Sequence, residues 1–130
     1  MSKYTLQESC DYAVKQMVKQ GSRCLNDDGI CVYDNGEGKH CAVGHIMKLW
    51  GEPENSRAWR YGSSVNGVAS SGTINDRHLL DFLRENTLAM MQLQIFHDSF
   101  HYNRRQYLEN LSEYVDTSGE HWQQWLEMGR

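Results

Sequence analysis

The chain lacks any apolar run of the roughly 20 residues that a membrane-spanning helix needs. It also lacks a surplus of positive charge, because 13 Lys and Arg residues face 17 Asp and Glu residues, for a net charge of −4. The only basic cluster is Arg104-Arg105, whereas affinity for nucleic-acid phosphates depends on many clustered cations. We therefore expect neither a membrane partner nor a nucleic-acid partner.

The first residues lack the apolar core of a signal peptide, so we expect a cytoplasmic protein. Four cysteines stand at positions 10, 24, 31 and 41. In a cytoplasmic protein these are expected to be reduced thiols, and a bridge between Cys31 and Cys41 would need an oxidising compartment. Internal repeats and low-complexity tracts are absent as well. The 130 residues suit a single domain over 1–130.

Helical patterns dominate what is present. Thr5 and Glu8 form a capping box before an apolar stripe that stops at Gly21. The remaining patterns predict five more helices. Two of them cover 43–50 and 88–101, one follows a cap at Asn75 or Asp76, one follows Asn103, and the last contains Trp122 and Trp125. The segment 88–101 has apolar residues in nearly every direction, which predicts a buried helix.

A β-hairpin is predicted between the first two helices. Residues 29–33 and 38–44 are short apolar runs around Asp34-Asn35-Gly36-Glu37-Gly38, which has the composition of a turn. The expected fold class is therefore α+β and predominantly α-helical, with four to six helices packed around one small hairpin. Residues 52–75 are expected to form an extended Gly/Ser-rich loop, either functional or a tolerated insertion.

Cys41 is the best candidate for chemistry. It lies where the second arm meets a helix, and the positive end of a helix dipole stabilises a thiolate. His97 and Asp98 end the predicted buried helix, and buried ionisable groups need partners. Because neighbours on a helix point about 100° apart, we expect His97 and Asp98 to reach separate partners. In one hypothesis Cys41 is a nucleophile, His97 its base, and Asp98 or a nearby amide the orienting group. In the other, His97 is a hydrogen-bonded core residue that ties the helix to the hairpin backbone.

A structural zinc site is a third alternative. Cys41 and His45 are four residues apart, as are His97 and His101, so each pair shares a helix face. The chain has no C-x-x-C pair and no H-E-x-x-H motif, and we assign neither a metal nor another cofactor. Trp59 and Tyr61, in the segment 52–75, are the expected binding residues.

Three motifs resemble those of a known family when they are taken together. They are Gly29-x-Cys31-x-Tyr33, Gly38-x-x-Cys41-Ala42-Val43-Gly44 and Leu93-Gln94-x-x-His97-Asp98. The combination resembles a family of small proteins from tailed phages, prophages and bacterial genomes. The resemblance implies that the hairpin and the central helix meet in space, but it implies no particular activity. After Gly44 the chain departs from the pattern, because His45-Ile46-Met47 replaces a stretch that often begins with another Cys or an apolar residue.

These observations favour an interaction protein. We expect a phage-type accessory protein that binds a host or phage macromolecule in the host cytoplasm, for instance to inhibit a host enzyme or a defence system during host takeover. The expected partner is a protein, while a small-molecule ligand stays open and the oligomeric state is not specified. The alternative is a thiol enzyme, a hydrolase or transferase, with the segment 52–75 as its lid.

Overall fold

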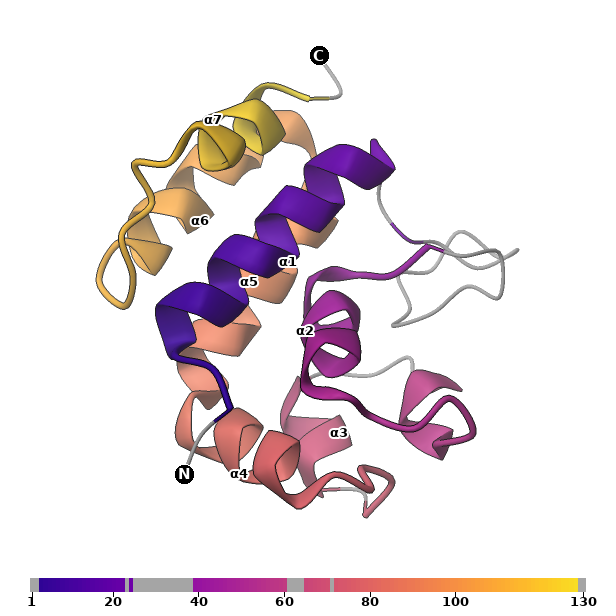
Figure 1. The fold of residues 1–130 in the computed structure, drawn as a ribbon. Coiled ribbons are helices and arrows are strands. Elements are labelled where there is room, and N and C mark those ends of the chain that lie inside the picture. Colours follow the sequence, from indigo (N-terminus) through magenta and orange to yellow (C-terminus); the bar gives the residue numbers. More distant parts are fainter. Residues whose placement is uncertain (1–2, 23, 25–38, 61–64, 71, 129–130) are drawn as a thin grey trace.

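A computed structural model of the protein describes residues 3–22, 24, 39–60, 65–70 and 72–128. Every regular element within these residues is a helix (Figure 1). In chain order they are α1 (Leu6–Gln20), α2 (Ala42–Trp50), the 3₁₀ helix η1 (Arg57–Arg60), α3 (Val65–Ser70), α4 (Arg77–Glu85), α5 (Thr87–Asp98), the 3₁₀ helix η2 (His101–Asn103), α6 (Arg104–Leu111) and α7 (Glu120–Glu127).

The predicted α+β class with a β-hairpin is wrong, because the described residues form an all-helical fold that contains no strand. The first arm and the turn lie outside the described residues. The end of the second arm is described, and there α2 already begins at Ala42, directly after Cys41 as its N-cap. Short apolar runs fit a buried helix as well as a strand, and the cap at Cys41 decides between the two for residues 42–44.

The signals predicted for both ends of α1 and for the start of α4 are confirmed. Thr5 and Glu8 make the reciprocal bonds of a capping box, and Gly21 ends α1 with a φ of 84°, which a residue without a Cβ adopts most easily. Asp76 caps α4 through a hydrogen bond from Leu79 N at 2.9 Å. Each of these signals acts within about one turn of helix, so it can be read from the sequence without knowledge of the tertiary structure.

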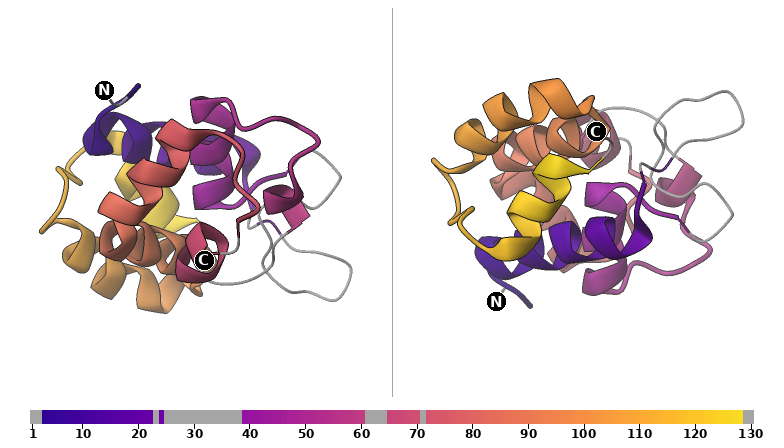
Figure 2. Two further views of the ribbon diagram at one scale, coloured as in Figure 1. Left: turned by 90° about the horizontal axis from the view of Figure 1, so that it is seen from below. Right: turned by 90° about the horizontal axis from the view of Figure 1, so that it is seen from above.

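Helix α5 lies at the centre of the fold, where α2, α3, α4 and α6 pack against it. Helix α1 packs against α2 on one side and against α7 on the other, and Figure 2 shows α7 lying along α1 in the view from above. No helix in the described parts of the chain is long and apolar enough to cross a bilayer.

Trp50, at the end of α2, joins three helices through its indole ring. The ring lies 4.6 Å from that of Phe82 on α4 and 5.8 Å from that of Tyr4, which precedes α1. Its Nε1 donates to Ser9 Oγ on α1 at 3.1 Å. A large aromatic side chain that is 1% exposed contributes much of the apolar burial at this end of the core.

The segment 52–75, expected to be an extended loop, contains η1 and α3. Its first residue, Glu52, is a carboxylate that is only 5% exposed. Its two oxygens accept from Asn75 N at 2.9 Å and Asp76 N at 2.8 Å, and Ser56 Oγ lies 2.5 Å away. Glu52 therefore joins the end of α2 to the start of α4, and no local sequence pattern predicts this.

Replacing Glu52 with Ala removes the acceptor of the part-buried N–H groups of Asn75 and Asp76 and one of the two acceptors of Ser56 Oγ. We expect the Glu52→Ala variant to lose about 3 kcal/mol in free energy of unfolding, measured by urea denaturation. Glu54 is exposed, so the matched Glu54→Ala variant should stay within about 0.5 kcal/mol of the parent protein. An equal loss in both variants would contradict the anchoring role of Glu52.

Asp11 on α1 holds α7 in place from a distance of about 110 residues along the chain. Its Oδ1 accepts from Trp122 Nε1 at 2.9 Å and lies 3.1 Å from His121 Nε2. Partial burial alone would raise the pKa of Asp11, but hydrogen bonds from Trp122, Gln7 and His121 outweigh burial and lower it. The ionised carboxylate is therefore bound more favourably in the folded protein than in the unfolded chain.

This lowered pKa predicts an acid-dependent loss of stability. The stabilisation from Asp11 is complete above the ordinary Asp value of about 4 and is lost as the pH falls through the lower folded value. We expect the Asp11→Asn variant to be less stable by about 1 kcal/mol at pH 7, with the difference from the parent shrinking below about pH 4. Thermal denaturation of both proteins between these pH values measures the difference in stability. Asp81→Asn, on the exposed side of α4, serves as control, and a difference for Asp11→Asn that stays constant with pH would contradict the account.

Candidate functional site

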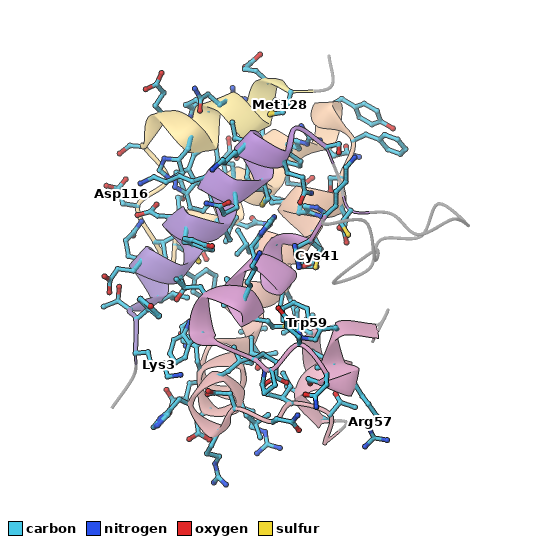
Figure 3. The ribbon with its side chains drawn as sticks, turned by 45° about the vertical axis from the view of Figure 1, so that its right-hand side comes forward. Lys3, Cys41, Arg57, Trp59, Asp116 and Met128 are labelled. Atoms are coloured by element: carbon cyan, nitrogen blue, oxygen red, sulfur yellow. The ribbon has the colours of Figure 1, made fainter. Side chains whose placement is uncertain are left out.

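Cys41 lies directly before α2, as its N-cap, inside the protein (Figure 3). Its backbone is extended, with φ −78° and ψ 179°, and its Sγ accepts a hydrogen bond from Gly44 N at 3.3 Å. This is the geometry of an N-cap, in which a side-chain acceptor satisfies an N–H group of the first helical turn. The thiol is 1% exposed, so its first role in the fold is to cap a buried helix.

Gln94 on α5 joins α2 to the end of α5. Its Oε1 accepts from Val43 N at 3.2 Å, which satisfies a second N–H group in the first turn of α2. Its Nε2 donates to Asp98 Oδ1 at 3.0 Å, one turn further along α5. The acceptor of this amide therefore joins α2 to α5, while its donor bond within α5 fixes the orientation of the side chain.

His97 and Asp98 are in direct contact, with His97 Nδ1 2.5 Å from Asp98 Oδ1. Our expectation that they reach separate partners is wrong, because α5 ends at Asp98 and the next residue, Ser99, is already extended. The 100° separation applies to side chains within a continuing helix, and the last helical residue has more freedom.

The second ring nitrogen of His97 also has a partner. Cys24 N donates to His97 Nε2 at 3.3 Å, so Nε2 carries the lone pair and Nδ1 carries the proton that Asp98 accepts. The ring is fully buried and stacks on Trp125 of α7, with centroids 5.7 Å apart and planes within 5°. Carboxylate, backbone and indole thus fix the tautomer and the orientation of the ring.

The structure brings Cys41, His97 and Asp98 into one region, but it pairs only the last two. The hydrogen bonds of Cys41 and His97, both described residues, do not join these two side chains. Burial raises the pKa of the Cys41 thiol well above its usual value, nearby Asp98 and Cys24 raise it further, and the bond from Gly44 offsets this only in part. A thiol nucleophile needs a thiolate and a base with a free lone pair. Here the thiol is neutral at pH 7 and the lone pair of His97 Nε2 is engaged by Cys24, so the catalytic assignment stays a prediction that this geometry does not favour.

The zinc alternative depended on His97 and His101 sharing one helix face. Because α5 ends at Asp98 and His101 belongs to η2, the four-residue spacing does not fall on one helix. The described residues contain no group of three or more His, Cys, Asp or Glu side chains that could hold a metal ion.

The two predicted binding residues have different outcomes. Trp59 is only 8% exposed, its Nε1 donates to Pro53 O at 2.8 Å, and its ring meets the ring of His40 edge-on at 5.5 Å. In Figure 3 Trp59 lies within the molecule, whereas Arg57 of the same short helix extends from its edge. Trp59 is therefore a core residue in this structure, and Tyr61 lies outside the described residues.

Phe100 and Tyr102 are the exposed aromatic pair that sequence reasoning missed. They are 57% and 74% exposed, and their rings stack 5.8 Å apart with planes within 6°. We predicted a helix over 88–101, which would have continued the buried face through Phe100. The serine at position 99 is the sequence signal that could have placed the end of this helix earlier. In the structure Ser99 ends α5 with an extended backbone, and its Oγ donates to Ile95 O.

Comparison of the chain with protein-family models, with curated proteins and with solved structures finds no match.

The state of Cys41 can be measured by alkylation. We expect iodoacetamide at pH 7 to modify Cys41 in the folded protein at least about tenfold more slowly than in the urea-unfolded chain, because the reactive thiolate is suppressed. Peptide mass spectrometry measures both rates, with Cys10, whose pKa burial and nearby Asp11 raise to about 12, as an internal buried reference. Labelling of native Cys41 as fast as a free thiol would contradict this and would favour the enzyme hypothesis.

Proposed function

We propose that this protein acts by binding a protein partner, a host or phage macromolecule, rather than by catalysis at Cys41. The observation that carries the proposal is the exposed, stacked pair of Phe100 and Tyr102. Aromatic side chains are enriched among the residues that contribute most to protein–protein affinity. Apolar surface exposed to water costs free energy, and this cost is recovered when a partner covers the surface.

The base of the pair is rigid, which supports the same proposal. Phe100 follows directly on Ser99, and Ser99 O accepts from Arg104 Nε at 3.1 Å. The other end of the Arg104 guanidinium donates to Trp125 O at 2.7 Å and Met128 O at 2.6 Å, and its carbon lies 4.4 Å from the Trp125 ring centroid. The turn that carries the two rings is thus anchored to α6 and α7. A preorganised contact loses little conformational entropy when it binds.

The buried hydrogen bonds of Cys41 and His97 also support the proposal, because they argue against catalysis at Cys41. Cys41 caps α2 and His97 is bonded at both nitrogens, so each side chain already has a structural role. A Cys41→Ser variant keeps a side-chain acceptor at the N-cap while removing the thiol, and it therefore separates structure from thiol chemistry.

A photo-crosslinking amino acid placed at position 102 tests the proposal in cells that contain the partner. We expect a discrete covalent adduct from position 102 and none from position 114, because Tyr114, 41% exposed, is not part of the pair. With the captured protein purified, Phe100→Ser should weaken binding by at least about 30-fold, in line with a loss of about 2 kcal/mol for an aromatic contact of this kind. Cys41→Ser should bind as the parent does.

Two results would contradict the proposal. One is an equal yield of adduct from positions 102 and 114. The other is a Cys41→Ser variant that folds normally but loses the biological activity while Phe100→Ser keeps it.

A further inference from the structure

A cavity of about 320 Å³ opens between α1, α2 and the two residues that lead to Cys41. Its walls carry three lysines, Lys19, Lys39 and Lys48, and two histidines, His40 and His45. The described residues that line it include no Asp or Glu. The chain has a net charge of −4, but the described residues that line this cavity carry only positive formal charges.

The wall of the cavity is held in place by side-chain bonds. Gln20, near the end of α1, donates to His40 O at 3.0 Å and accepts from His40 N at 2.8 Å. Lys39 Nζ donates to Ser22 Oγ at 2.7 Å. These bonds tie the entry of α2 to the end of α1, and so fix one wall of the cavity.

His45 gives the cavity an unsatisfied polar group. The residue is 6% exposed, and its Nε2 is a buried atom without a hydrogen-bond partner. Burial, together with His40, His97 and Lys48, lowers the pKa of His45 to about 3, so the ring is neutral at pH 7. A buried nitrogen without a partner is costly. Nε2 itself is closed to solvent in this structure, so a ligand oxygen that removes this cost reaches it through a rotation of the ring toward the cavity.

We propose that this cavity binds a small phosphate ester, with the phosphate held by Lys19 and Lys48 and the organic part placed against His40 and His45. Lysine is a common phosphate binder that acts as a point charge, and lysines supply the cations of the described wall. The exposed Lys19 and Lys48 place two cations at the cavity, which matches a phosphate dianion better than a singly charged carboxylate. The volume of about 320 Å³ falls at the lower end of small-molecule sites.

A small ligand fits this feature better than a nucleic acid does. Binding to a nucleic-acid backbone needs a stripe of cations along a surface, whereas these lysines line one hollow. The cavity shares no residue with the Phe100 and Tyr102 pair, so this inference and the proposed binding function can fail separately.

Isothermal titration of the 130-residue chain tests the proposal with four probes: adenosine 5′-monophosphate, ribose 5-phosphate, inorganic phosphate and adenosine. We expect the two esters to bind, inorganic phosphate to bind more weakly, and adenosine not to bind. Lys19→Gln and Lys48→Gln should each weaken binding of the better ester by about tenfold, since each removes a charge-assisted bond. Lys15→Gln is the matched control, because Lys15 is exposed on α1 and does not line the cavity.

Nitrogen NMR of histidine-labelled protein provides a readout that surface charge alone would not change. The His45 Nε2 resonance should shift on addition of ribose 5-phosphate, while that of His78, exposed on α4, should not. The proposal is overturned if no ester binds, if Lys15→Gln weakens binding as much as Lys19→Gln, or if His45 does not respond. It is also overturned if a short DNA duplex competes at lower concentration than the esters and loses affinity in the same lysine variants.

Discussion

The carboxylate of Asp98 accepts hydrogen bonds from the His97 ring and from the Gln94 amide at the same oxygen, and the arrangement around α5 depends on that atom. Because Asp98 accepts the proton of His97 Nδ1, His97 Nε2 keeps its lone pair and accepts from Cys24 N. Because Gln94 is turned toward Asp98, its oxygen is left to accept from the first turn of α2. One carboxylate thus decides the tautomer of a buried histidine and the seating of a second helix.

Asp11 and Glu52 repeat this pattern elsewhere in the molecule. Each carboxylate accepts from donors on a segment far away in sequence, α7 for Asp11 and the start of α4 for Glu52. Backbone bonds of a helix are made within the helix, whereas a sheet joins distant segments through its backbone. In the described, strand-free parts of this chain, the task of joining distant segments by hydrogen bonds falls to side chains. Carboxylates suit it because one ionised group accepts several bonds.

The difference between local bonds within a helix and side-chain bonds between distant segments explains what could be predicted from the sequence. The ends of α1 and α4 follow from Thr5, Glu8, Gly21 and Asp76, whose effects are local. The contacts that matter for the site are not local: Cys24 meets His97 across 73 residues, and Asp11 meets Trp122 across 111. No periodicity specifies such pairs. Errors also arose where a local rule was extended past a helix end, as with the contact between His97 and Asp98 and the exposure of Phe100. The hairpin failed because a short apolar run does not distinguish a strand from a buried helix.

Cys41 shows how one position can support opposite conclusions about reactivity. From the sequence, its place at a helix N-terminus favours a thiolate, and the structure confirms that place. The interaction of a charge with a helix dipole contributes typically 0.3–1 kcal/mol and about 2 kcal/mol at most. Removing an ion from water into the interior costs several kcal/mol, and Cys41 is 1% exposed. Burial therefore outweighs the dipole, and the position that would activate an exposed thiol here keeps a buried one protonated.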